Sequence, residues 1–231
     1  ESRGLGDVYK RQDSNVGSRK ERNIRDNLFV VNASMNSVSK NESDPVDIQI
    51  FDIAKCFDTL WLKEVLNDLY EGSLTSENFE ILYLENTKII DKIKTPYGIS
   101  EEFVIKDSVL QGTVFGPLKC SVQMDKLAKE CYGQGKSLYT YKNTVKIPVL
   151  GMVDDLLAVA KCGHESIKTN STVNSFIESK QLKFGEKKCH KLHIGKTFCQ
   201  CPVLKVHDEE MKAVEKEKYL GDILSSNGNH Q

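Results

Sequence analysis

Three aspartates interrupt segments that are otherwise apolar. Asp52 lies within QIFDIAKCF (residues 49–57), and Asp154 and Asp155 lie together within IPVLGMVDDLLAVAKC (residues 147–162). Apolar runs with β-branched residues are typical of buried strands, where an ionised carboxylate is costly unless a cation or a polar edge compensates it. We therefore expect these aspartates either to do chemistry or to form polar turns at the ends of strands.

The chemistry that two facing carboxylates favour is the binding of a divalent cation. If Asp52 and Asp154 lie on neighbouring antiparallel strands, their charges repel each other unless a cation lies between them. Mg²⁺ suits such a site because it binds one or two carboxylates and keeps positions for substrate phosphates. Two such ions about 3.5–4 Å apart stabilise the attacking and leaving oxygens of a phosphoryl transfer. The alternative is that Asp52 ends a strand and the aspartate pair forms a turn without metal.

The composition is that of an ordinary globular domain. Of the 231 residues, 39% are hydrophobic and 28% are charged, and the net charge of −1 indicates neither nucleic acid nor a membrane as partner. Seven lysines between residues 180 and 205 accompany one acid, Glu186, and this stripe fits either phosphates or solvent. No signal peptide and no membrane-spanning run is present, and the seven cysteines are scattered. These features predict an intracellular protein, nuclear or cytoplasmic, that is not secreted and has no disulfide partner.

The order of the expected elements predicts an α+β domain with helices packed on one face of an antiparallel sheet. Asp58 and Ser76 are expected as helix N-caps, and Asp154 and Asp155 are expected at the turn of a hairpin. The elements are a helix over 28–35, a strand over 47–53, helices over 59–70 and 76–86, a strand pair within 88–106, a helix over 118–132, a hairpin over 147–162, a helix over 166–180 and strands over 187–195 and 217–224.

Five motifs in this order resemble those of the reverse transcriptase palm. FDIAKCFD (residues 51–58) resembles the first palm motif, and QGTVFGPL (111–118) resembles the second. GMVDD (151–155) resembles the paired-aspartate hairpin, LKFGEKKCHKLHIGK (182–196) the fourth motif with its lysine, and KYLGDIL (218–224) the primer-grip region. Together with the lead-in GSRKERNIRDNLFVVN, they are most similar to the non-LTR (LINE-type) retrotransposon branch.

The resemblance implies a role for each matched residue. Asp52, Asp154 and Asp155 correspond to the metal-binding carboxylates, and the backbone carbonyl of Ile53 to a further ligand of the same ions. Lys188 corresponds to the lysine that donates toward the pyrophosphate leaving group. The residues that correspond to substrate contacts are Phe57 beneath the deoxyribose, and Gln111 and Gly112 against the incoming nucleotide and template. Without the resemblance, Phe57 could equally be a core aromatic, and Lys188 one surface lysine among seven.

The resemblance also implies an activity and a set of partners. The chain is expected to be part of an RNA-directed DNA polymerase that adds dNTPs to a DNA primer on an RNA template, using two Mg²⁺ ions or Mn²⁺ as a substitute. We interpret residues 1–12 as adapter-derived or disordered, 13–46 as a partial fingers lead-in and 47–231 as the palm, with the fingers incomplete and the thumb absent. The alternatives are an inactive nucleic-acid-binding remnant and another palm polymerase, of the maturase or telomerase type. Without fingers and thumb, the chain alone is expected to be inactive.

Some residues depart from the family pattern or suggest a different site. Met152 stands where many members carry an aromatic residue, and Gly185 stands where the fourth motif often has an asparagine. Neither change removes a metal ligand. A zinc site also has to be weighed for a group of cysteines and histidines, but its spacing fits no common zinc-finger pattern, and we expect structural roles instead. This group consists of Cys189, His190, His193, Cys199, Cys201 and His207.

Overall fold

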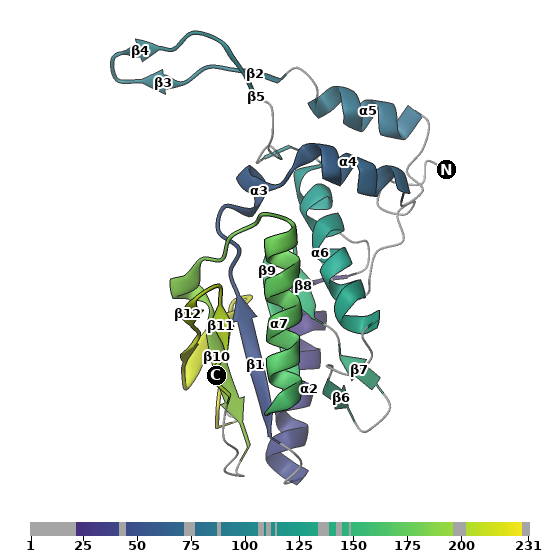
Figure 1. The fold of residues 1–231 in the computed structure, drawn as a ribbon, viewed down its shortest axis with the longest axis vertical. Helices are drawn as coiled ribbons and strands as arrows, with labels where there is room; N and C mark the ends of the chain where they lie inside the picture. The colour runs from purple at the N-terminus through teal and green to yellow at the C-terminus, as the bar shows by residue number, and fades with distance from the viewer. Residues whose placement is uncertain are drawn as a thin grey trace.

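The fold is described from a computed structural model of the 231-residue chain (Figure 1). The description covers residues 22–41, 45–71, 77–86, 89–105, 109, 112–113, 115–133, 139–141, 145–147, 149–195 and 202–227. Several sequence-based predictions concern residues outside these ranges, namely the segment 1–12, the cap Ser76, the nucleotide contact Gln111, and Cys199 and Cys201 of the group weighed for zinc.

A five-stranded sheet forms the centre of the molecule. Its strands lie in the order β13-β10-β1-β9-β8, and all neighbours are antiparallel except β10 and β13, which are parallel. The central strand β1 is hydrogen-bonded on both sides, as its continuous burial requires. The strands are β1 (Val46–Phe51), β8 (Leu150–Met152), β9 (Asp155–Lys161), β10 (His190–Ile194) and β13 (Lys212–Ala213).

Two hydrophobic clusters cover the two faces of this sheet. Phe51 of β1 packs with α6 (Gly116–Gly133) and α7 (His164–Ser179) on one face. On the other face, Ile48 and Ile50 pack with Met35 of α2 (Ile24–Asn41) and with the β14–β15 hairpin. The split follows from the period of two along a strand, which sends neighbouring side chains to opposite faces. The predicted α+β class is confirmed. Helices α6 and α7 share one face as expected, while α2 lies on the opposite face.

A smaller part of the chain projects away from the sheet (Figure 1). It contains three helices and a long hairpin, and it follows β1 in the sequence. The helix expected from residue 59 onward is in fact two helices, because buried Leu60 is extended and separates them. Asp58 therefore lies inside the first helix, whose N-cap is Lys55, and is not a cap itself. These elements are α3 (Cys56–Thr59), α4 (Leu62–Glu71), α5 (Glu77–Asn86), the β2–β5 ladder (Ile89–Asp91, Phe103–Ile105) and the β3–β4 tip (Lys94–Thr95, Gly98–Ile99).

The remaining described elements lie near the C-terminal half of the chain. The strand expected over residues 187–195 is shorter, because residues 186–188 form a 3₁₀ turn, η1 (Glu186–Lys188), before β10 begins. The predicted pair over residues 217–224 is present as β14 (Lys216–Tyr219) and β15 (Asp222–Ser225). The others are β6 (Tyr139–Tyr141), β7 (Val145–Ile147), β11 (Lys205–Val206) and β12 (Glu209–Glu210). In the part of the chain that the structure describes, no helix combines the length and the apolar character needed to cross a bilayer.

A buried lysine joins α6 to α5. The Lys119 side chain is fully buried, and its Nζ donates to Glu85 Oε2 at 3.0 Å and to Asn86 Oδ1 at 2.7 Å. Burial lowers the pKa of Lys119, while Glu85 acts in the opposite direction. This contact attaches the projecting part to the helix that follows the second palm motif.

We expect Lys119→Met to lower the free energy of unfolding by about 3 kcal/mol, because Glu85 and buried Asn86 lose their donor. Urea denaturation would measure the change. The exposed Lys63 of α4 provides the matched control, and Lys63→Met should change stability by less than about 0.5 kcal/mol. Equal stabilities of the two variants would contradict the structural role of Lys119.

Candidate active site

The paired aspartates lie at a tight turn at one end of the central sheet. Met152 of β8 pairs with Asp155 of β9, so Val153 and Asp154 form a two-residue hairpin loop. Val153 has a φ of 62°, a left-handed conformation that is strained for a β-branched residue. The turn resolves the conflict between apolar strands and carboxylates, because it brings both aspartates to the edge of the apolar layer.

Asp52 reaches the same edge from the central strand. Phe51 of β1 pairs with Leu156 of β9, so the next position along β1, Asp52, lies beside Asp155. Lys188 of η1 approaches from the other side, and its Nζ lies 3.2 Å from Asp52 Oδ1. The structure therefore brings together Asp52, Asp154, Asp155 and Lys188, four residues that the sequence analysis selected from three separate motifs.

The charges of the three aspartates affect one another. Burial raises the pKa of Asp154, the negative charge of Asp52 raises it further, and Lys188 lowers it. Burial also raises the pKa of Asp155, followed by the charges of Asp154 and Asp52. Nearby like charges raise the pKa of a carboxylate, so these shifts indicate that the three aspartates lie close together. A divalent cation bound between them would compensate their negative charge.

Two residues that the sequence analysis did not select hold Asp52 in place. The backbone N–H of Gly185 donates to the Asp52 carbonyl at 2.9 Å, and a Cβ at Gly185 would lie well inside 3.0 Å of Asp52 Oδ2. The Asp52 N–H donates to Cys189 Sγ at 3.4 Å. Burial raises the pKa of Cys189 to about 11, so the thiol stays neutral beside the carboxylates. The sequence analysis named Gly185 only as a departure from the family pattern, and Cys189 only within the group of cysteines and histidines weighed for zinc.

The predicted carbonyl ligand, Ile53, lies in an isolated bridge next to Asp52. Ile53 and Phe184 form an antiparallel bridge flanked by two hydrogen bonds, Ala54 N to Lys183 O at 2.8 Å and Gly185 N to Asp52 O at 2.9 Å. In this pattern the bridging residues do not bond to each other, so the Ile53 carbonyl is directed away from Phe184.

The predicted substrate contacts are placed only in part. Phe57 lies in α3, is half-buried and packs against the cluster that covers the α6–α7 face of the sheet. Its carbonyl accepts a hydrogen bond from Val109 N at 2.8 Å. Gly112 is exposed, with a φ of 81°, and has open space around it. Gln111 lies outside the described residues, so its predicted contact stays a prediction.

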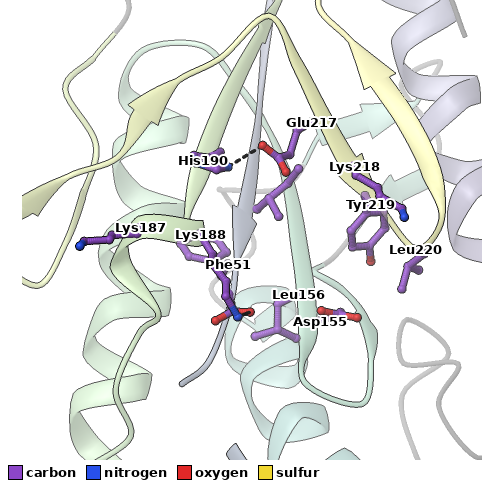
Figure 2. A pocket seen from close by; sticks show the side chains of 12 residues that line it. Phe51, Asp155, Leu156, Lys187, Lys188, His190, Glu217, Lys218, Tyr219 and Leu220 are labelled. Carbon is purple, nitrogen blue, oxygen red and sulfur yellow. Dashed lines mark hydrogen bonds and ion pairs between the residues drawn. The ribbon is translucent and has the colours of Figure 1, made fainter. Parts of the chain in front are cut away.

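A pocket of about 230 Å³ opens beside Asp52 and Asp155 (Figure 2). The β14–β15 hairpin, which the sequence analysis matched to the primer grip, forms one wall through Lys218 and Tyr219. Nδ1 of His190 lies 2.5 Å from Glu217 Oε2, and this contact connects the hairpin to β10. Tyr219 is buried in the wall, and burial together with the charge of Asp155 raises its pKa. The pocket thus connects the carboxylate site with the predicted primer-grip hairpin.

The cysteines and histidines of residues 189–207 do not gather at one point in the part of the chain that the structure describes. Cys189 contacts Asp52, His190 pairs with Glu217, and His193 Nδ1 lies 2.9 Å from Asp47 Oδ1. Outside this group, Cys162 is disulfide-bonded. This corrects the expectation of no disulfide partner. A disulfide requires two cysteines that lie close together in the fold, and the spacing of cysteines along the sequence does not show which of them do.

Without divalent metal, the aspartate site should make stability depend on pH. Because the pKa values of Asp154 and Asp155 are raised above 3.8, the folded state holds more protons than the unfolded state just above that pH. The contribution of these residues to the free energy of unfolding should therefore fall as pH rises from 3.8 through their raised pKa values. The free energy of unfolding would be measured at several pH values for wild type and for an Asp154→Asn, Asp155→Asn double variant. The difference between the two proteins gives the contribution of these aspartates. A difference in stability that stays flat or rises with pH would contradict the raised pKa values of Asp154 and Asp155.

The comparison with family models identifies the family. The model described as reverse transcriptase (RNA-dependent DNA polymerase) matches residues 7–224. The chain belongs to the reverse transcriptase family. A search among curated proteins found no match.

Solved telomerase structures share the fold of this reverse transcriptase domain. Telomerase from Candida tropicalis in complex with the TWJ fragment of telomeric RNA is 13% identical, with a TM-score of 0.65 over 94% of this chain and 34% of that chain. Telomerase from Candida albicans with the same kind of fragment is 15% identical, with a TM-score of 0.62 and the same coverage. Apo telomerase from Candida tropicalis truncated from its C-terminal domain is 16% identical, with a TM-score of 0.59 over 94% of this chain and 40% of that chain. The chain therefore spans little more than a third of the telomerases that it matches.

Proposed function

We propose that this reverse transcriptase domain is the palm and part of the fingers of a non-LTR retrotransposon polymerase. It would add dNTPs to the 3′-hydroxyl of a DNA primer on an RNA template. The observation that carries the polymerase activity is the meeting of Asp52, Asp154 and Asp155 at one end of the sheet, where burial and neighbouring charges raise the pKa values of Asp154 and Asp155. The assignment to the non-LTR branch rests on the resemblance of the sequence motifs and the lead-in. Oxygen ligands of this kind suit Mg²⁺, with Mn²⁺ as a substitute.

The residues of this chain would position the reaction. Two bound Mg²⁺ ions supply charge neutralisation for the primer oxygen and the leaving pyrophosphate. Asp52, Asp154, Asp155 and the Ile53 carbonyl are the proposed ligands. Lys188, which now pairs with Asp52 and is 74% exposed at its side chain, is free to turn toward the leaving group and donate a proton to it. Gln111 and Gly112 are proposed to contact the nucleotide and the template.

Phe57 provides a test of substrate choice. We expect Phe57→Val to relax discrimination against ribonucleotides, because the smaller side chain would leave room for a ribose 2′-hydroxyl. The measurement is the ratio of dNTP to rNTP incorporation by a longer protein that contains this chain, and we expect this ratio to fall at least about tenfold. Phe79, which packs against the same cluster from α5, provides a matched control. Phe79→Val should leave the ratio unchanged, and an unchanged ratio in Phe57→Val would assign Phe57 to the core alone.

Primer extension tests the function as a whole. A longer protein that contains this chain should extend a DNA primer on an RNA template when Mg²⁺ is added. The chain alone should not, since orienting the reactants contributes about 7–11 kcal/mol to such reactions and the fingers and thumb supply that orientation. Binding of the primer–template by the longer protein without any extension would favour the inactive remnant. Efficient extension by the chain alone would contradict the proposed requirement for fingers and thumb.

A telomerase-type enzyme is the second candidate, and the shared fold of the Candida telomerases favours it. The two candidates differ in their choice of template. A retrotransposon polymerase should copy RNA added in trans over its whole length, whereas an enzyme of the telomerase type should copy a short segment repeatedly. The lengths of the extension products therefore distinguish them.

A further inference from the structure

A second group of potential metal ligands lies at the opposite end of the central sheet. Asp47 lies near the start of β1, and Asp52 follows the other end of the same strand. His193 is the partner of Asp47 on β10, and Cys162 directly follows β9, with its N–H bonded to Pro45 O at 2.8 Å. Because Asp47 pairs with Ala160, and Cys162 is two residues further, all three side chains point to the same face of the sheet.

The ligand atoms of these residues are close enough to share one ion. The Asp47 carboxylate, the Cys162 sulfur and the His193 ring nitrogen all lie within 4.8 Å of one another. Around a tetrahedral zinc with bonds of about 2.0–2.3 Å, ligand atoms lie about 3.3–3.8 Å apart. His193 Nδ1 and Asp47 Oδ1, at 2.9 Å, need to separate only slightly to reach that spacing.

The burial of Asp47 gives an independent indication of a cation. Its side chain is fully buried, and its Oδ2 has no hydrogen-bond partner in the described part of the chain. A carboxylate in this position is costly unless positive charge compensates both of its oxygens, and His193 reaches only Oδ1. This carboxylate belongs neither to the aspartate site nor to the pocket beside it.

We propose that Asp47, Cys162 and His193 bind one Zn²⁺ ion when Cys162 is reduced, with water as the fourth ligand. A set of sulfur, nitrogen and oxygen ligands suits Zn²⁺, whereas Mg²⁺ takes oxygen ligands. In the disulfide form of this structure, the Cys162 sulfur is not available to a metal. Reduction by a thiol or phosphine adds two electrons and two protons to the disulfide. Zinc binding then releases the proton of the Cys162 thiol.

Zinc at this position would join three neighbouring strands, β10, β1 and β9, at the end of the sheet away from the aspartates. It would also hold the segment that leads into α7, which begins two residues after Cys162. The site is therefore structural, and it is independent of the proposed polymerase function.

Cobalt substitution tests the proposal without any assay of activity. The purified 231-residue chain, kept reduced with a phosphine and freed of metal, would be titrated with Co²⁺ and then with Zn²⁺. We expect one Co²⁺ per chain to give a thiolate-to-cobalt charge-transfer band, and Zn²⁺ to abolish this band. Cys162→Ser should remove this band, and Asp47→Asn and His193→Gln should each weaken binding at least about tenfold. Cys131→Ser, a buried cysteine of α6, is the matched control and should keep the band.

Alkylation gives a second measurement that requires no variant. Zn²⁺ should slow the alkylation of Cys162 in the reduced wild-type chain, as followed by mass spectrometry of the Cys162 peptide. A reduced chain with no thiolate band and no protection of Cys162 would overturn the proposal. So would a band that survives in Cys162→Ser, because other cysteines would then hold the ion. Metal bound only by the aspartates would give no thiolate band, and it would also count against the site.

Discussion

Asp154→Asn should lower Mg²⁺-dependent primer extension by about 10³-fold or more in a longer protein that contains this chain, which corresponds to about 4 kcal/mol of lost transition-state stabilisation. Asp154 lies at the hairpin turn, and its raised pKa reflects burial and the nearby charge of Asp52. An amide has nearly the same shape but lacks the charge that binds the cation. We therefore expect the variant to fold and to bind the primer–template duplex about as tightly as wild type.

A single-turnover extension assay and a separate duplex-binding measurement would distinguish these effects. The matched control is Asp208→Asn, in the turn between β11 and β12, which removes one carboxylate and leaves the aspartate site intact. Asp208→Asn should stay within about threefold of wild type, because it removes a charge from an exposed side chain. If Asp154→Asn extended primers at the wild-type rate, the proposed metal role would be wrong.

Gly185→Ala is expected to reduce primer extension by about 10²-fold. The substitution changes no charged group, and we expect it to act by displacing the Asp52 carboxylate. The added Cβ would lie well inside 3.0 Å of Asp52 Oδ2, so either the carboxylate or the loop must move. The Gly185 backbone holds the Asp52 carbonyl at 2.9 Å, which limits how far the loop can retreat. The apparent affinity for Mg²⁺ in the extension assay should weaken together with the rate, as expected when a ligand is displaced.

Glu186→Ala is the control for this experiment, because Glu186 is the next residue, is exposed and lies in the same turn. It should leave both the rate and the Mg²⁺ dependence close to wild type. An active Gly185→Ala with a normal Mg²⁺ dependence would show that Asp52 can rotate away from the new methyl group without loss of function, and it would remove Gly185 from the site.

Much of the fold could be predicted from local patterns. The alternation in β1, the hairpin around Asp154 and Asp155 and the periodic helices α6 and α7 all follow from rules that act within about 20 residues. The interrupted helix at Leu60 could not be predicted in this way. Its residues suit a helix, and the break comes from the extended backbone of one buried leucine. The 3₁₀ turn before β10 also depends on a residue far away in the chain. The N–H of Gly185, its N-cap, donates to the Asp52 carbonyl, and the Lys188 side chain contacts the Asp52 carboxylate, more than 130 residues away.

The amino-acid sequence by itself determined the α+β class and the reverse transcriptase family, and it was enough to select the three aspartates as candidates. Carboxylates within apolar strands and ordered motifs are visible without any coordinates. Only the tertiary structure decided that Asp52 lies beside Asp155, that Gly185 and Cys189 hold Asp52, and that Asp47, Cys162 and His193 meet at the far end of the sheet. Strand pairing brings together residues that are far apart in the chain, and a register shift of one residue would send each side chain to the other face.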